Sequence, residues 1–397
     1  MTESSKINIA VIAYTQYSRD PRVRRASDAL VSSAFEVDCF VLAEEGKSNF
    51  EVKHGVNLIR LPHSQYRGSS SIKYLFSYLK FFLLMFVKLS SREYRRKYRL
   101  IHFNNMPDFI IFAGLFPKIF GTKLILDIHD PMPEVFKTKF PDYLSTVGHW
   151  LMVIEEKISA AFSDFVITVH DPIMSVLTHN NRINKNKITV IANFADESLF
   201  DKTKYSRTNE SDDFKMIYHG TIATRFGLDI IIEGLEMVLK NHKAIKFNIY
   251  GKGDTIEELR KLITIKNMDS IVDIHGQIEL DELPQKIVDS DLGIVSYRRS
   301  VATEYMLPLK LMEYMAMGVP VLSVQNKAIS YYFNDGELLY YESDDADSFA
   351  EKLSYILNNR EKIGEMKSNI NKARKRMNWE IEKQKYIDLV RDLISES

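Results

Sequence analysis

The sequence predicts an α/β protein with two doubly wound domains, each built on a mostly parallel sheet. Three observations carry this prediction. The chain has 397 residues, which exceeds what one hydrophobic core usually supports. Short β-branched apolar runs alternate with helical patterns, and this alternation occurs twice, on either side of a polar segment. Continuous apolar runs of this kind are typical of parallel strands that are buried on both faces.

Seven apolar runs in the first half predict strands, with helical patterns between most of them. The runs are INIAVIAY, EVDCFVLA, VNLIRLP, LIHFNN, KLILDIHD, DFVITVH and ITVIAN. Together they predict a first domain over residues 1–194. The segment ADESLFDKTKYSRTNESDDF, residues 195–214, is polar and without period, which is typical of a linker between domains.

Five further runs predict the sheet of a second domain over residues 215–380. They are FKMIYHG, KFNIYG, VDIHG, LGIVSY and PVLSV. From about Asp345 the pattern is helical throughout, and residues 381–397 are expected to form a C-terminal helix. In open α/β sheets ligands bind at the carboxyl ends of strands. Polar residues directly after each run are therefore the candidate site.

The composition limits the partners and the compartment. Lys and Arg number 53 and Asp and Glu also 53, so no net charge attracts nucleic acid. A single cysteine, Cys39, excludes an intramolecular disulfide and a zinc site of several thiolates. The start MTESSKINIAVIAY lacks the cleavage-site pattern of a signal peptide. We therefore expect a cytoplasmic protein.

The most membrane-like stretch is LFSYLKFFLLMFVKL, residues 75–89. It is too short to span a bilayer, because a spanning helix needs about 20 mostly uncharged residues. Residues 60–99 hold ten Lys or Arg against one acid, Glu93. This pattern fits either a helix that lies on an anionic leaflet or a core helix with a solvated basic end. Both interpretations stay open, with residues 72–99 as the candidate membrane contact.

Arginines gather after the first predicted strand, in YSRDPRVRR. Asp20 fits an N-cap and Pro21 the first helical position, so a helix is expected to start here. Arg19 and Arg22, ahead of Arg25, are then expected to form an anion-facing rim. The pattern G-x-G-x-x-G is absent from this loop, which disfavours a dehydrogenase that binds a nicotinamide dinucleotide.

The run LDIHDPMPE brings four polar side chains to the end of the fifth strand: Asp127, His129, Asp130 and Glu134. A histidine in this place can simply cap the strand. A histidine beside acids at the carboxyl end of a strand can also meet a ligand, and we favour this interpretation.

Two loops of the second domain carry glycines and a cation. In YHGTIATRFGLD, Gly220 permits a close turn and Arg225 stands near the start of the next helix, where a phosphate can bind. In IYGKGD, Gly251 and Gly253 can let the backbone approach a ligand, although such a pair is more often just a turn.

The most specific pattern is ATEYMLPLKLMEYMAMGVPVLSV, residues 302–324. Pro308 fits the first position of a helix that ends near Gly318. Amides around Leu309, Lys310 and Leu311, with the Lys310 ammonium, would then form an anion site for a diphosphate.

Two glutamates flank this predicted helix start. The Glu313 carboxylate lies one turn further on and can accept hydrogen bonds from two ribose hydroxyls. Glu304, just before the helix, can reach a group that hangs from the phosphate.

With these residues the chain resembles glycosyltransferase family 4, whose members transfer sugars from nucleotide-sugars with retention and share the GT-B fold of two Rossmann-like domains. The motifs that carry the resemblance are HDPMPE, VITVH, ITVIANFADESLF, HGTIATRFGLD, IYGKGD, VDIHG and above all TEYMLPLKLMEYMAMGVPV. The resemblance implies that His129 contacts the donor sugar, Arg225 and Lys310 bind the diphosphate, Glu313 binds the ribose and Glu304 the sugar hydroxyls.

The sequence departs from the family pattern in two places. Eight residues separate Glu304 from Glu313, where the usual motif has seven, and this spacing with L-P-x-K resembles a branch of the family. The usual Lys-Gly after the first strand of the second domain is Phe226-Gly227, which leaves Arg225 as the nearest cation.

The resemblance implies a UDP- or GDP-sugar donor, and a leaving diphosphate that accepts the proton of the acceptor hydroxyl. No metal or other cofactor is expected. The resemblance also implies that the helix over residues 381–397 crosses back to the first domain. The first domain would bind a glycan acceptor, for which the basic and aromatic stretch favours a lipid-linked one, as in the synthesis of surface polysaccharides. Two alternatives stay open: a nucleotide-sugar epimerase or hydrolase on the same fold, and a non-catalytic nucleotide-sugar binding protein.

Overall fold

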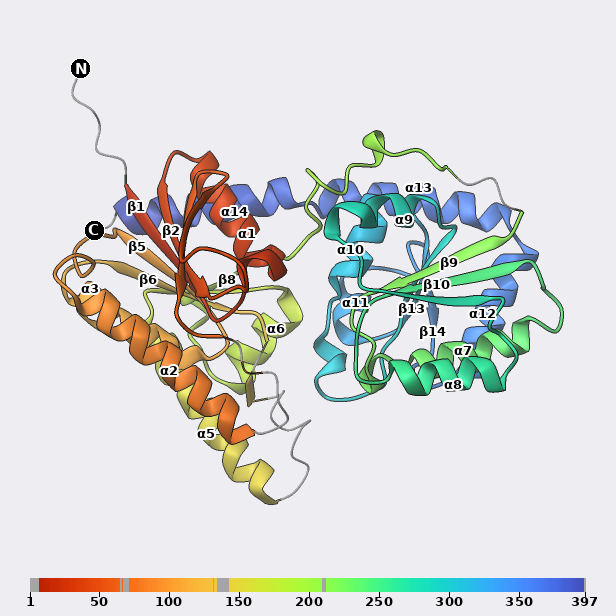
Figure 1. Ribbon diagram of the computed structural model, residues 1–397, viewed down its shortest axis with the longest axis horizontal. Coiled ribbons are helices and arrows are strands. Elements are labelled where there is room, and N and C mark those ends of the chain that lie inside the picture. The colour runs from red at the N-terminus through yellow and green to blue at the C-terminus, as the bar shows by residue number, and fades with distance from the viewer. Residues whose placement is uncertain are drawn as a thin grey trace. The chain divides into compact units, whose positions relative to one another are not determined.

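A computed structural model describes residues 7–64, 66, 71–130, 132–133, 143–208 and 212–395. The chain forms two compact units, one of Met1–Asn193 with Glu380–Ser397 and one of Phe194–Trp379 (Figure 1). Each unit carries its own mostly or wholly parallel sheet, as the repeated alternation of apolar runs and helical patterns predicts. Residues 195–208 of the predicted linker belong to the second unit, where Arg207 makes two hydrogen bonds to Asp291, of 2.6 and 3.0 Å.

The described part of the first unit contains an eight-stranded sheet in the order β3-β4-β2-β1-β5-β6-β7-β8. Its strands are β1 (Asn8–Ala13), β2 (Glu36–Leu42), β3 (Phe50–Lys53), β4 (Val56–Leu61), β5 (Leu100–Asn104), β6 (Lys123–Ile128), β7 (Phe165–Thr168) and β8 (Ile188–Val190). The seven predicted runs form β1, β2 and β4 to β8. The edge strand β3 is antiparallel and was not predicted, because its side chains are largely exposed and it has no apolar run.

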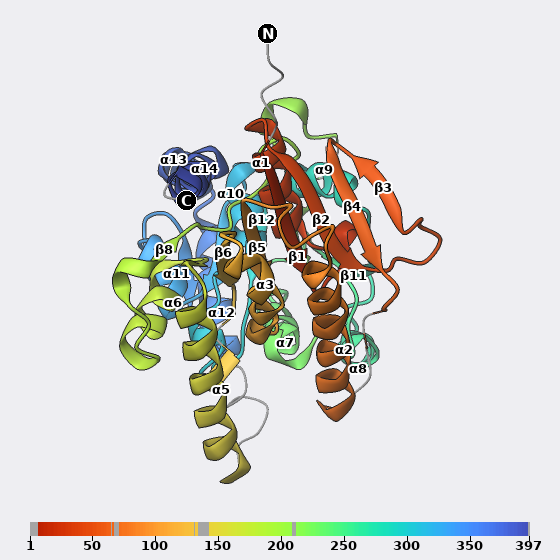
Figure 2. The ribbon, with the colours of Figure 1, turned by 90° about the vertical axis from the view of Figure 1, so that its left-hand side faces the viewer.

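The helices of this unit lie on both faces of the sheet. They are α1 (Pro21–Ser32), α2 (Ser71–Ser90), α3 (Leu115–Ile119), α5 (Tyr143–Phe162), α6 (Asp171–Ser175) and α14 (Trp379–Ser395). Helix α1 connects β1 to its neighbour β2 on one side, whereas α2, α3 and α5 lead to strands on the other side of β1. Because such crossovers are right-handed, α1 lies on one face of the sheet and α2, α3 and α5 lie on the opposite face. Figure 2 shows α2 and α5 as two long helices that extend from the sheet on the same side.

The described residues of the second unit form a six-stranded parallel sheet in the order β11-β10-β9-β12-β13-β14. Its strands are β9 (Phe214–His219), β10 (Ile245–Tyr250), β11 (Val272–Gly276), β12 (Leu292–Val295), β13 (Val321–Val324) and β14 (Leu339–Tyr341). Its helices are α7 (Leu228–Val238), α8 (Ile256–Ile265), α9 (Leu283–Val288), α10 (Leu309–Ala316), α11 (Lys327–Tyr332), α12 (Ala346–Asn358) and α13 (Glu361–Arg376). The three-residue β14 was not predicted, because the short apolar run around it, LLYY at residues 338–341, cannot be told from part of a helix by periodicity.

Both strand orders reverse direction once, between β1 and β5 in the first sheet and between β9 and β12 in the second. Open α/β sheets bind ligands beside such a reversal, at the carboxyl ends of the strands. The fold therefore directs attention to the loops after β1, β5 and β6 in one unit, and to those after β9, β10 and β12 in the other.

Candidate active site

In the second unit, the end of β9 and the start of α10 lie against each other. Gly220 has a φ of +120°, and a Cβ there would lie 3.4 Å from the Lys310 Nζ atom. The predicted helix exists, but Pro308 is its N-cap and Leu309 its first residue, one position later than expected. Gly318, with a φ of +68°, follows the C-cap as predicted. The Leu311 amide donates to the Pro308 carbonyl over 3.1 Å, so the helix itself uses this predicted anion donor.

Lys310 is a buried cation at this helix start. Its Nζ atom lies 3.7 Å from the centre of the Tyr218 ring and 5.1 Å from that of Phe226, and the residue is 8% exposed. Burial lowers the pKa of Lys310 to about 7, with Arg225 adding to the decrease and Glu313 opposing it. An anion bound here would restore the positive charge.

Glu313 lies one turn along α10, beside the last residue of β9. The His219 Nε2 atom is 3.1 Å from the Glu313 Oε2 atom, and the His219 ring stands edge-on to Tyr314, with ring centres 5.1 Å apart. Burial, with the nearby Lys310 charge, holds the pKa of His219 well below its usual value. A neutral histidine and a carboxylate thus lie side by side, with hydrogen-bonding groups suited to hydroxyls.

The other predicted donor residues lie on neighbouring loops. Arg225, on the short turn Thr224–Phe226, is exposed and stacks over the Phe226 ring at 4.7 Å. Glu304 is half-buried on the turn Thr303–Tyr305. Asn326 ties that turn to the rest of the unit by donating to the carbonyls of Thr303 and Met306, over 2.8 and 2.9 Å.

Gly251 and Gly253 have a packing reason. A Cβ at Gly251 would lie 1.8 Å from the Gly220 carbonyl oxygen, and one at Gly253 would lie 1.6 Å from the Ile222 carbonyl oxygen. The loops after β9 and β10 touch backbone to backbone, so the space beside these glycines is filled by the chain itself. This contact fixes the position of Gly220.

In the first unit, His129 follows β6 and is held by polar partners. Its Nε2 atom lies 2.7 Å from Asp127 Oδ2, and its backbone amide donates to Asn105 Oδ1 over 3.0 Å. The Asn105 amide group donates to the Asp130 carbonyl, also over 3.0 Å. Burial would raise the pKa of Asp127, but the contacts with His129 and His102 outweigh it and hold that pKa well below its usual value.

The predicted arginine rim carries less free positive charge than expected. Arg22 makes two hydrogen bonds of 3.0 Å to Asp20, which also caps α1 as predicted by accepting from the Arg22 amide. Asp130 and Asp127 add to the negative field around Arg22. Arg19 is exposed, and Arg25 is buried and donates to Asn193 over 3.2 Å. The expectation that Arg22 stands ready for an anion therefore needs correction, because an acid already binds it.

Glu134, the last residue of the run LDIHDPMPE, lies outside the described residues. Among the residues that are described, no group of three or more His, Cys, Asp or Glu side chains could hold a metal ion.

Two histidines near the predicted site residues, His219 and His102, were not predicted from the sequence. His219 ends β9 and meets the same criterion that identified His129, a polar residue at the carboxyl end of a buried strand. His102, in the middle of β5, has no such signal, yet its Nε2 atom lies 3.3 Å from Asp127 Oδ2.

Two family models match the chain. One, described as "Glycosyltransferase Family 4", matches residues 22–199, and the other, "Glycosyl transferases group 1", matches residues 213–359. Together they span most of both units.

Two curated relatives share part of the sequence. A poly(ribitol-phosphate) alpha-N-acetylglucosaminyltransferase of Staphylococcus aureus is 26% identical over 182 residues, which are 45% of this chain and only 34% of that relative. A chitobiosyldiphosphodolichol beta-mannosyltransferase of Debaryomyces hansenii is 21% identical over 330 residues, 77% of this chain and 69% of that relative. The chain thus spans about a third of the first relative.

Solved structures share the fold. A sucrose-phosphate synthase from Thermosynechococcus elongatus superposes with a TM-score of 0.76 at 18% identity, covering 99% of this chain and all of that one. Anabaena HepE, in complex with UDP and glucose, superposes with a TM-score of 0.70 at 15% identity, covering 97% and 100%. With both family models matched and the two-sheet fold in place, the chain belongs to the group 1 glycosyltransferases, in glycosyltransferase family 4, and has their GT-B fold.

Proposed function

We propose that the protein transfers a sugar, with retention, from a nucleotide-diphosphate sugar to a glycan acceptor. The observation that carries the proposal is Lys310, a lysine buried at a helix start, whose pKa burial lowers to about 7. A buried cation is costly unless an anion joins it. The diphosphate of a UDP- or GDP-sugar supplies that anion, and the HepE complexes with UDP support this class of donor.

In the proposed reaction the second unit holds the donor. Lys310 and Arg225 offset the charge that develops on the leaving diphosphate, and Glu313 accepts bonds from the ribose hydroxyls. Glu304 and His129 would contact the sugar, as the family resemblance implies. The leaving diphosphate takes the proton of the acceptor hydroxyl, so no side chain is needed as a base. The residues named here then position the substrates and stabilise the leaving group.

Donor binding is tested by thermal shift with UDP-, GDP-, ADP- and TDP-sugars. A donor at 100 times its Kd stabilises the fold by about 2.7 kcal/mol. We expect one nucleotide class to raise the Tm of the wild type and to leave that of Lys310→Met unchanged. If no nucleotide-sugar shifts the wild-type Tm, the proposal fails. Turnover of the donor with no acceptor would favour an epimerase or hydrolase, and binding without any turnover a sensor.

The proposed acceptor is lipid-linked, and the support is a broad apolar face on the first unit. Twelve large apolar side chains on or next to α2, α3 and α5 are exposed, out of twenty among all described residues. They are Leu75, Phe76, Leu79, Leu83, Val87, Leu115, Phe116, Ile119, Phe120, Trp150, Leu151 and Ile158. We call these twelve residues the apolar face. An exposed patch of this kind is typical of a surface that meets a membrane or a partner.

The opposite side of α2 is buried through Phe81, Met85 and Leu89, so this helix is apolar on both sides. Neither interpretation from the sequence is therefore complete: α2 is a core helix and also presents apolar side chains outward. None of the described helices is both long enough and apolar enough to cross a membrane.

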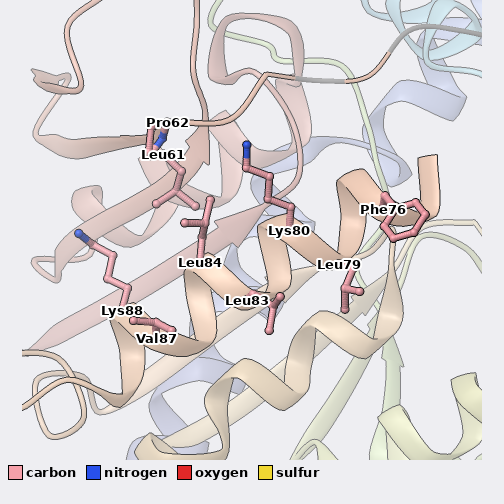
Figure 3. A pocket seen from close by; sticks show the side chains of 9 residues that line it. All are labelled: Leu61, Pro62, Phe76, Leu79, Lys80, Leu83, Leu84, Val87 and Lys88. Atoms are coloured by element: carbon pink, nitrogen blue, oxygen red, sulfur yellow. The ribbon is translucent and has the colours of Figure 1, made fainter. Parts of the chain in front are cut away.

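A groove of about 570 Å³ lies between α2 and the end of β4. Figure 3 shows Leu61 and Leu84 facing each other across it, with the amino groups of Lys80 and Lys88 on either side. Hydrocarbon walls with cations at the rim fit a lipid chain that carries an anionic head group. Of the ten basic residues in the region 60–99, Arg60 and Lys97 are bound to acids.

Membrane contact is tested by sedimentation of the full chain with vesicles of phosphatidylcholine alone, or with added phosphatidylglycerol. We expect binding to the anionic vesicles, since each exposed Phe, Leu or Val that enters the bilayer contributes roughly 1.5–3 kcal/mol. Phe76→Ser with Val87→Ser should weaken binding, while Ile265→Ser with Tyr355→Ser, which are also exposed but lie in the second unit, should not. Equal binding of both variants would point to a water-soluble acceptor.

A further inference from the structure

We infer that Asp127, His102 and Tyr386 are positioning residues that hold His129 in one tautomer, with its Nδ1 atom free to accept a hydrogen bond from a ligand hydroxyl. The inference rests on the proposed function only for the identity of that ligand, the donor sugar. The tautomer itself is a property of the first unit alone.

The three residues form one hydrogen-bonded chain that ends on His129. The Tyr386 hydroxyl lies 2.7 Å from His102 Nδ1, His102 Nε2 lies 3.3 Å from Asp127 Oδ2, and that same oxygen lies 2.7 Å from His129 Nε2. Tyr386 and His102 are each 1% exposed and His129 is 5% exposed. Water has little access to compete for these contacts.

The chemistry of the groups fixes the direction of each bond. An ionised carboxylate can only accept, so both histidines must carry a proton on Nε2. Burial opposes ionisation of Asp127, but hydrogen bonds from His102 and His129 help to hold its pKa well below the usual value, so it stays ionised. Burial raises the pKa of Tyr386 far above its usual value, so its hydroxyl keeps its proton and donates to His102 Nδ1. In neutral His129 the remaining lone pair is then on Nδ1.

The Nδ1 atom, which carries this lone pair, is the atom of the ring that lacks a partner. His129 Nδ1 is buried and makes no hydrogen bond to any described atom, although every other polar atom of the ring and its backbone amide has a contact. The Asn105 side chain accepts from the His129 amide and donates to the Asp130 carbonyl, and so holds the backbone of His129 in place. A buried acceptor held this firmly points to a donor supplied by a ligand.

The chain of contacts begins on the last helix of the protein. Tyr386 comes from α14, 284 residues from His102 in the sequence. Nearby on α14, Glu382 accepts from the Ala192 amide over 2.8 Å and is 5% exposed. The C-terminal helix therefore supports the environment of His129 directly.

The tautomer is measured on the full chain with ¹⁵N-labelled histidine, by long-range ¹H–¹⁵N correlation without any donor. His129→Gln identifies the signal among the ten histidines. We expect the Nε2–H form in the wild type. In Asp127→Asn the new amide can donate to Nε2, so the Nδ1–H form should appear. An Nδ1–H form in the wild type would overturn the inference.

Kinetics provide the second measurement. Asp127→Asn should lower kcat by about 10- to 100-fold, the range known for loss of the hydrogen-bond partner of a metal-binding histidine, with little change in the donor KM. Tyr386→Phe, which keeps the ring, should lower kcat less, and it carries the test if Asp127→Asn does not fold.

Matched controls exist in the same unit. Asp38 and Tyr98 form a similar buried pair, with 2.6 Å between the hydroxyl and the carboxylate, and contact none of these residues. Asp38→Asn and Tyr98→Phe should lower the Tm but leave kcat and the His129 tautomer unchanged. If both pairs of variants act alike on tautomer and kcat, the role is merely structural and the inference fails. If the wild type shows no transfer, the tautomer measurement still decides.

Discussion

Two buried histidines, His129 in the first unit and His219 in the second, each lie beside a carboxylate but in opposite electrostatic surroundings. The His219 and Glu313 pair lies next to Lys310 and Arg225, and the pKa of His219 is held well below its usual value by burial and the Lys310 charge. The pair of His129 and Asp127 lies among further acids. From this difference we expect the surroundings of His219 to favour an anion and those of His129 to favour a neutral hydroxyl.

The largest expected effect comes from removing the positive charge of the second unit. Lys310→Met should lower kcat/KM for the donor by about 10²- to 10³-fold, because a fixed charge at the leaving diphosphate is lost. Steady-state kinetics with the donor found by thermal shift measure this. Without donor, the Tm should not fall, since a buried lysine contributes little to stability.

Lys215→Met is the matched control for Lys310→Met. Lys215 is also 8% exposed, in the same sheet but near the amino end of β9. Its replacement should leave kcat/KM unchanged. An equal loss of activity in both variants would mean that buried lysines in this unit act through the fold.

The second largest effect is expected at the contact between the loops after β9 and β10. Gly251→Ala places a Cβ 1.8 Å from the Gly220 carbonyl, and we expect a loss of about 2–3 kcal/mol in the free energy of unfolding, measured by urea denaturation. Gly364→Ala, on α13 with no atom within 4 Å of its Cβ, should instead add roughly 0.5–1 kcal/mol. A mild effect at Gly251 would show that the two loops can separate.

The pH dependence of donor binding sharpens the contrast between the two surroundings. With the pKa of Lys310 near 7, the ammonium is lost as the pH rises through 7, so the donor KM should rise above that pH. Glu313 favours the charged form, so Glu313→Gln should move this midpoint to lower pH. Arg225 disfavours it, so Arg225→Gln should move the midpoint to higher pH. Shifts in the same direction would contradict the assignment.

The lowered pKa of Lys310 also makes the stability of the protein depend on pH. Between about pH 7 and the ordinary lysine pKa of 10.5, the unfolded chain binds a proton at Lys310 that the folded chain lacks. Stability without donor should therefore rise with pH across this window, and the rise should be smaller in Lys310→Met. Chemical denaturation at several pH values measures it.

How far the sequence predicts the molecule depends on whether each feature is local. Long buried strands such as β1 and β9 show as apolar runs, and Gly318 marks the end of α10 because its positive φ favours glycine. The edge strand β3 has no such run, and the run around β14, LLYY, is too short to distinguish a strand from a helix. At the site, Lys310 and Glu313 follow from one continuous motif, whereas the contact of Tyr386 with His102 joins positions 284 residues apart. No local pattern contains that information.

The smallest effect is expected for Arg19 and Arg22, which the sequence predicts for the same anion-facing rim. Arg22 is bound to Asp20 and surrounded by further acids, whereas Arg19 is exposed. If the first unit binds an anionic substrate at this rim, Arg19→Ala should raise its KM by at most about fivefold, as expected for an exposed charge pair, and Arg22→Ala by less. Steady-state kinetics of the two single variants provide the measurement. A larger effect of Arg22→Ala would mean that the substrate displaces Asp20, and the acidic surrounding assigned to His129 would then hold only without substrate.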